Sequence, residues 1–116
     1  MEQRYKTLAS EILSKVDKLQ WKRSNYADSY EVSLGKGTVI IINNKQRQRE
    51  NPFLNLPLYD LRFLNERGEV VYSIEANNTV LDENKALLED LYNKAYHTYM
   101  QTEETLRSMF DDLSII

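Results

Sequence analysis

The sequence is poor in the residues that make covalent, metal-binding and phosphate-binding sites easy to recognise. None of its 116 residues is cysteine, which excludes a disulfide framework, a thiol nucleophile and a zinc site with cysteine ligands. The glycine pair of Gly35-Lys36-Gly37 precedes a β-branched run and not a helix, so it does not predict a phosphate-binding loop. The lack of cysteine fits a reducing compartment, and we expect a cytoplasmic protein.

Long apolar segments are also missing. No apolar run approaches the ~20 residues that span a bilayer, and the N-terminal sequence MEQRYK has no apolar stretch behind its charges, so no signal peptide is expected. The hydrophobic fraction of 41% and the charged fraction of 28% are typical of a globular protein. We expect residues 1–116 to form a single α+β domain without a membrane segment.

Histidine occurs once, and its surroundings do not predict catalysis. A catalytic histidine needs an orienting acceptor and a nucleophile or substrate within reach, but one helical turn before His97 stands the neutral amide Asn93. Adjacent carboxylates on a helix point in different directions, so the acidic pairs do not predict joint sites; these are Glu89-Asp90, Glu103-Glu104 and Asp111-Asp112. We therefore expect no catalytic, metal-binding or cofactor-binding residues, and a protein that is not an enzyme.

Apolar periodicity predicts a helix at the N-terminus. The apolar residues recur at steps of three and four, which gives one stripe on a helix of about five turns; they are Tyr5, Leu8, Ala9, Ile12, Leu13, Val16 and Leu19. We expect Trp21 to fold back onto the same core. The segment 22–28 is polar and is interpreted as a turn region.

The middle of the chain predicts four strands in two hairpins. Residues 30–34 alternate between apolar and polar, and residues 38–42 form a continuous β-branched run typical of a central strand. Residues 59–63 and 70–74 alternate in the same way, and Asn65 to Gly68 reads as a type I turn closed by a left-handed glycine. The prediction is a four-stranded antiparallel meander.

The C-terminal third predicts one long helix or two shorter ones. Asp82 is a credible N-cap, and an apolar stripe follows at alternating steps of four and three, formed by Leu88, Tyr92, Ala95, Tyr99, Thr102, Leu106, Met109 and Leu113. Thr102-Glu103-Glu104 could cap a fresh helix, so we favour a break or bend near Gln101. With the N-terminal helix and the meander, this gives an α+β two-layer sandwich.

Tyrosine is abundant, with eight residues. Five of them fall at core-facing positions, namely Tyr30, Tyr59, Tyr72, Tyr92 and Tyr99. Core filling is the interpretation we prefer, because a tyrosine ring can line a sandwich while its hydroxyl reaches the rim. The alternative is an aromatic-lined groove between sheet and helices.

Several segments together resemble a loose group of small uncharacterised bacterial domains with a helix–meander–helix layout. They are Trp21-Lys22, Tyr30-x-Val32-x-Leu34-Gly35, the β-branched run, Tyr59-x-Leu61-x-Phe63-Leu64-Asn65-x-x-Gly68-x-Val70-Val71, and Leu91-Tyr92-x-x-Ala95. The resemblance covers most of residues 8–113. It implies this fold but no activity and no catalytic residues, and the long segment 43–57 departs from the short connection of the group.

Segment 43–57, NNKQRQRENPFLNLP, joins the two hairpins and is longer than a hairpin needs. Loops of this length in a compact domain are often functional or disordered. Lys45, Arg47 and Arg49 could track phosphates, so nucleic-acid binding is the alternative function. The segment ends in an apolar tip that includes Phe53, Leu54 and Leu56.

The function that we favour is protein–protein contact. Ile40 and Ile42 face away from Val39 and Ile41, so they lie on a sheet face that two helical regions on the other side would not cover. Together with Phe53, Leu54 and Leu56 they are the candidate partner-binding residues, and a homodimer is the simplest way to cover them, with a different partner second. In the alternative interpretation, Phe53 and Leu54 form a lid over that face.

The charge distribution is uneven along the chain. Residues 1–68 carry twelve Lys and Arg against eight Asp and Glu, whereas residues 69–116 carry three against ten. The acidic C-terminal region is either a solvated helix or a surface that meets a basic partner.

Overall fold

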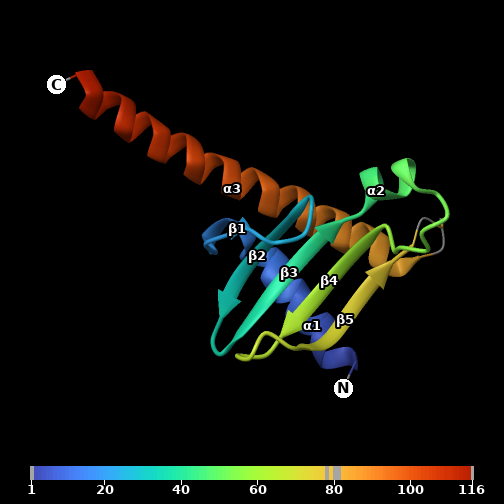
Figure 1. Cartoon of the computed structure of the whole chain (residues 1–116). Helices are drawn as coiled ribbons and strands as arrows, with labels where there is room; N and C mark the ends of the chain where they lie inside the picture. Colours follow the sequence, from blue (N-terminus) through green and yellow to red (C-terminus); the bar gives the residue numbers. More distant parts are fainter. Residues whose placement is uncertain (1, 78, 80–81, 116) are drawn as a thin grey trace.

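A computed structural model describes residues 2–77, 79 and 82–115. It has two layers, a five-stranded antiparallel sheet and a layer of helices (Figure 1). The elements in chain order are α1 (Glu2–Ser14), the 3-10 turn η1 (Val16–Lys18), β1 (Lys22–Arg23), β2 (Ser29–Leu34), β3 (Gly37–Asn43), α2 (Lys45–Glu50), β4 (Tyr59–Leu64), β5 (Val70–Ala76) and α3 (Glu83–Ile115). The α+β class is confirmed.

The sheet has one strand more than the sequence predicts, so the expectation of four strands is wrong. The strands follow one another in chain order from β1 to β5. The additional strand, β1, has two residues, and Lys22 and Arg23 pair with Glu31 and Tyr30 of β2. Two exposed cations show no alternation, so periodicity could not reveal this edge strand.

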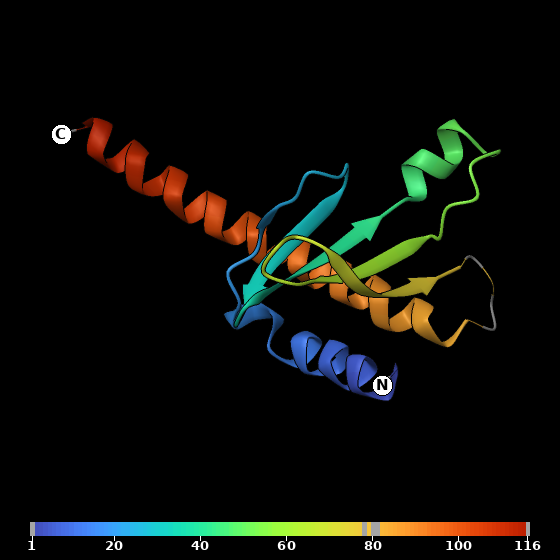
Figure 2. The same ribbon diagram turned by 60° about the horizontal axis from the view of Figure 1, so that its bottom comes forward.

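Helices α1 and α3 cover the same face of the sheet (Figures 1 and 2). The residues that point to this face from β2, β3 and β4 alternate along each strand and are almost fully buried, for example Val32, Ile41 and Leu61. From α3 the same core receives Leu88, Leu91 and Ala95. None of the helices in the described part of the chain is long and apolar enough to cross a membrane.

The N-terminal helix is shorter than its apolar stripe suggests. The α-helix ends at Ser14, and Val16 belongs to the 3-10 turn η1. The indole Nε1 of Trp21 donates to the carbonyl of Val16 at 2.9 Å, and Trp21 is 5% exposed. Trp21 does fold back onto the core, and the chain reverses through η1 in place of a fifth helical turn.

Both predicted hairpin connections are present. Gly35 has φ of +57°, and Gly68 has φ of +79° and donates to the carbonyl of Asn65 at 3.0 Å, as a type I turn closed by glycine requires. Asn65 Oδ1 accepts from the amides of Arg67 and Glu69 at 3.0 Å. At Gly37 a Cβ would stand 2.7 Å from the carbonyl oxygen of Leu64, which explains the second glycine of the first hairpin.

Tyrosine rings fill the core, as preferred from the sequence. Tyr30 is 3% exposed, and its ring centroid lies 5.7 Å from that of Tyr92 and 5.3 Å from that of Tyr99. At the other end of the sheet, Tyr5 of α1 stacks on Tyr72 at 4.2 Å. Burial of its hydroxyl raises the pKa of Tyr92 to about 12.

The C-terminal helix is continuous, and the expected break near Gln101 is wrong. Asp82 caps it, because its Oδ1 accepts from the amide of Asn84 at 2.9 Å. The hydroxyl of Thr102 donates to the carbonyl of Thr98, and the hydroxyl of Thr105 to that of Gln101. These hydroxyls bond within the helix, so Thr102 is an interior residue and does not start a new helix.

Candidate functional site

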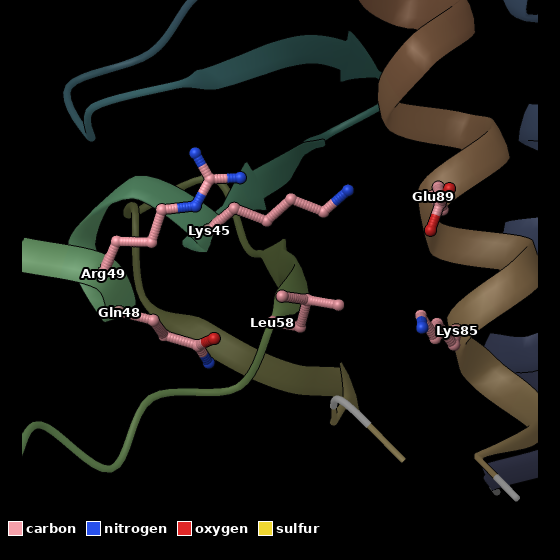
Figure 3. A pocket seen from close by; sticks show the side chains of 6 residues that line it. All are labelled: Lys45, Gln48, Arg49, Leu58, Lys85 and Glu89. Atoms are coloured by element: carbon pink, nitrogen blue, oxygen red, sulfur yellow. The ribbon is translucent and has the colours of Figure 1, made fainter. Parts of the chain in front are cut away.

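A pocket of about 520 Å³ opens between α2 and the first turns of α3. It is lined by Lys45, Gln48, Arg49, Leu58, Lys85 and Glu89; we call it the cationic pocket. Figure 3 shows that Lys45 reaches across from α2 toward α3, which supplies Lys85 and Glu89. The pocket therefore joins the long connection between the hairpins to the start of the C-terminal helix.

Helix α2 lies within the segment that the sequence predicts as a long loop. Residues 45 and 49 are one turn apart and share the face of α2 that lines the pocket, whereas Arg47 does not line it. The structure thus brings together two of the three cations proposed to bind phosphates. It adds Lys85, which sequence reasoning missed because Lys85 and α2 are distant in sequence.

The second candidate site is the part of α3 that leaves the body of the protein. Residues 101–115, here called the arm, extend past β1 and β2 (Figures 1 and 2), and all except Glu103 are exposed. Four apolar side chains form a stripe on one side of the arm, which we call the arm stripe: Leu106 is 48% exposed, Met109 60%, Phe110 63% and Leu113 66%. These four side chains are not packed into the hydrophobic core.

A hollow of about 400 Å³ lies at the foot of the arm. It is lined by Leu106 and Met109 of the arm stripe, by Asp17 of η1, and by Thr98, Gln101, Thr102 and Thr105 of α3. A molecule that contacts the arm stripe can therefore also contact the body of the protein.

The partner-binding residues predicted from the sequence do not form one patch. Ile40 and Ile42 lie on the sheet face that the helices leave uncovered, yet they are only 5% and 2% exposed. Their cross-strand neighbours on that face include the long side chains of Glu31 and Arg62 beside Ile40, so little apolar area remains for a partner there. Val71, on β5, is 52% exposed.

The apolar tip of the connecting segment points away from the sheet. Phe53 is 96% exposed and Leu54 42%, whereas Leu56 is half-buried. A lid over the second sheet face would bury Phe53, so that alternative is wrong. The tip follows α2, and α2 and the arm lie at opposite ends of the molecule in both views.

The single histidine lies on an exposed part of α3. The ring centroid of His97 is 5.2 Å from that of Tyr96. Within the described residues, no group of three His, Cys, Asp or Glu side chains is placed to hold a metal ion.

Comparison with protein families, curated proteins and solved structures gave no significant match. The resemblance to small bacterial helix–meander–helix domains therefore stays a prediction. The functional argument depends on the geometry of the cationic pocket and of the arm.

One signal in the sequence could have revealed the arm. A helix of 33 residues is about 50 Å long, whereas a strand of six residues covers about 20 Å. A helix that crosses one small sheet therefore cannot bury its whole stripe. The length of the apolar repeat, and not its composition, indicates exposed apolar surface.

Proposed function

We propose that this protein is a non-enzymatic binding or regulatory domain that acts through protein–protein contacts made by the arm. The observation that carries the proposal is the arm stripe, whose four apolar side chains are 48–66% exposed on one side of a helix. Contiguous exposed apolar surface of this kind usually marks an interface. The cytoplasm remains the compartment that we propose, because the absence of cysteine fits reducing conditions.

The stability of the arm also favours a partner. Most helices in proteins are stabilised chiefly by packing of an apolar face. In the arm, all residues except Glu103 are exposed, and contact with the body of the protein is made at its foot. A helix laid against the arm stripe would supply the missing packing.

The charge of the arm favours a basic partner over a second copy of this chain. The arm carries Glu103, Glu104, Asp111 and Asp112 against the single cation Arg107, and Asp17 adds a carboxylate at its foot. At about 100° per residue, Glu103 and Asp112 lie beside the arm stripe, whereas Glu104 and Asp111 lie on the far side of the helix. Two arms packed stripe to stripe would bring the flanking carboxylates close together, where like charges repel. The expected occupant is an amphipathic helix whose apolar stripe is flanked by Lys and Arg.

The test uses two synthetic peptides as partners for the full chain. One has the sequence of residues 99–115, and the other has the same sequence with Glu103, Glu104, Asp111 and Asp112 replaced by lysine. We expect the lysine peptide to bind, with an affinity that falls as salt rises, and the unmodified peptide not to bind. Calorimetry measures both affinities, and sedimentation of the protein alone is expected to show a monomer.

Two variants locate the binding surface. Leu106→Ser with Met109→Ser removes half of the arm stripe and should abolish binding. Ile115→Ser is the matched control, because Ile115 is an exposed apolar residue nine positions after Leu106 and thus on the opposite side of the helix. The proposal is wrong if neither peptide binds the wild type, or if both variants bind as the wild type does. If the wild type is a dimer and the double variant is a monomer, the partner of the arm is a second copy of this chain and not a basic helix.

A further inference from the structure

We propose that the cationic pocket is a binding site for a small organic phosphate, held by Lys45 and Arg49 of α2 and by Lys85 of α3. This site is independent of the arm. The argument depends on how the walls are fixed, on the balance of charge and on the size of the pocket.

The wall formed by α2 is fixed to the chain that enters β4. Asn44 donates from its backbone amide to the carbonyl of Leu58 and from Nδ2 to that of Pro57, both at 2.9 Å. Gln48 Nε2 donates to the carbonyl of Leu56 at 2.6 Å. These bonds hold a helix of only six residues in place, so a ligand meets a wall that is already formed.

The opposite wall is the first part of α3, which is anchored in the core. Leu88 and Leu91 of α3 are fully buried, and Lys85 and Glu89 stand on the side that lines the pocket. Leu58, only 4% exposed, also lines the pocket and lies between the two walls (Figure 3). The charged groups therefore project from two rigid supports around an apolar base.

The charge of the pocket is positive in a protein whose net charge is −3. Three cations and one carboxylate line it. Lys45 and Lys85 are half-buried, and Lys45 Nζ lies 5.4 Å from the ring centroid of Tyr59, a favourable position for a cation. Cations that are partly removed from water and face one cavity favour an anion of high charge.

The size of the pocket favours a small molecule over a nucleic-acid backbone. A volume of about 520 Å³ is in the range of ligand sites, roughly 300–1,000 Å³. A phosphate group offers three acceptor oxygens and a charge close to two at neutral pH, which matches the excess of two cations. Glu89 can accept a hydrogen bond from a hydroxyl group of the organic part.

The probe is glycerol phosphate, followed by amide NMR shifts of the full chain. Glycerol tests whether binding requires the phosphate group, and inorganic phosphate tests whether the phosphate group alone is enough for binding. Succinate tests whether a carboxylate can take the place of the phosphate. We expect glycerol phosphate to shift amides of α2 and of residues 83–89 with saturation, and glycerol to shift none. Binding of succinate as tight as that of glycerol phosphate would overturn the assignment to a phosphate.

Helix α2 supplies its own control variant. The double variant Lys45→Gln, Arg49→Gln should bind glycerol phosphate about tenfold or more weakly than the wild type does. Lys85→Gln, in the opposite wall, should also lower the affinity, and Arg47→Gln should leave the affinity unchanged. A single-stranded oligonucleotide is the second probe, and it tests the alternative that the cations bind nucleic acid. If Arg47→Gln weakens binding of either probe as much as the double variant of Lys45 and Arg49 does, the cations act as a diffuse surface and the proposed pocket site is wrong. The proposed site is also wrong if no probe binds.

Discussion

At the scale of single residues, the sheet face opposite the helices is organised around Asp60. Its side chain is 5% exposed, and Oδ2 accepts from Arg62 Nε at 2.9 Å, while no hydrogen-bond partner reaches the buried Oδ1 within the described residues. Arg62 also donates from Nη1 to the hydroxyl of Tyr26 at 2.8 Å and lies 4.8 Å from the centroid of that ring. One guanidinium thus neutralises a buried carboxylate and fixes an aromatic ring from the β1–β2 connection.

Arg62→Met tests this role. The variant keeps an apolar stem but leaves Asp60 buried without its cation, so we expect the free energy of unfolding to fall by about 3 kcal/mol. The double variant Asp60→Asn, Arg62→Met removes both charges and should be more stable than Arg62→Met alone. Urea unfolding of both proteins measures the difference, and a double variant that is less stable than the single one would contradict this account.

At the scale of elements, α3 combines two environments in one helix. Its first half contributes Leu88, Leu91 and Ala95 to the core, whereas the arm is exposed. Since a helix end with few buried contacts opens more readily than a packed one, hydrogen exchange should be slow for amides of residues 88–99 and fast for residues 105–115. Binding of the lysine peptide should slow the second group, and uniform protection along α3 in the free protein would refute the expected difference.

The elements differ in how far the sequence predicts them. Strands β2 to β5 alternate or run continuously in apolar residues, so their number and order follow from periodicity. Helix α2, with the sequence KQRQRE, has no apolar face and is held by Asn44 and Gln48 through bonds to the chain before β4. Such bonds depend on contacts across a loop, which no local pattern records.

The candidate sites also combine features that the local sequence predicts with features that depend on distant contacts. The arm stripe is present in the sequence as a repeat, but its exposure depends on where the sheet ends. The cationic pocket needs Lys85 beside α2, and this proximity exists only once the folded sheet has brought the start of α3 next to the connection between β3 and β4. The sequence alone identifies Lys45 and Arg49 as candidate phosphate-binding residues. Only the helical turn of α2 shows that these two line the pocket and that Arg47 does not.

At the scale of the whole molecule, the arm makes the protein elongated. The radius of gyration is 15.8 Å and the extents are 54 × 35 × 26 Å, whereas a compact chain of this length has a radius of about 13 Å. A chain ending at Gln101 should have a radius of gyration close to about 13 Å in solution scattering. The free energy of unfolding of this shortened chain should differ from that of the full chain by less than about 1 kcal/mol, because the removed side chains are almost all exposed. If the shortened and full chains have the same radius of gyration, the arm folds back onto the body in solution.

The continuity of α3 gives it the geometry of an unequal lever. Leu91 is held in the core, Lys85 lies about 9 Å before it along the helix axis, and Ile115 about 36 Å after it, at 1.5 Å per residue. A rigid tilt of about 5° around Leu91 moves Lys85 by less than about 1 Å and Ile115 by about 3 Å. The geometry of α3 alone therefore makes any rigid tilt of the helix about four times larger at the tip of the arm than at the pocket.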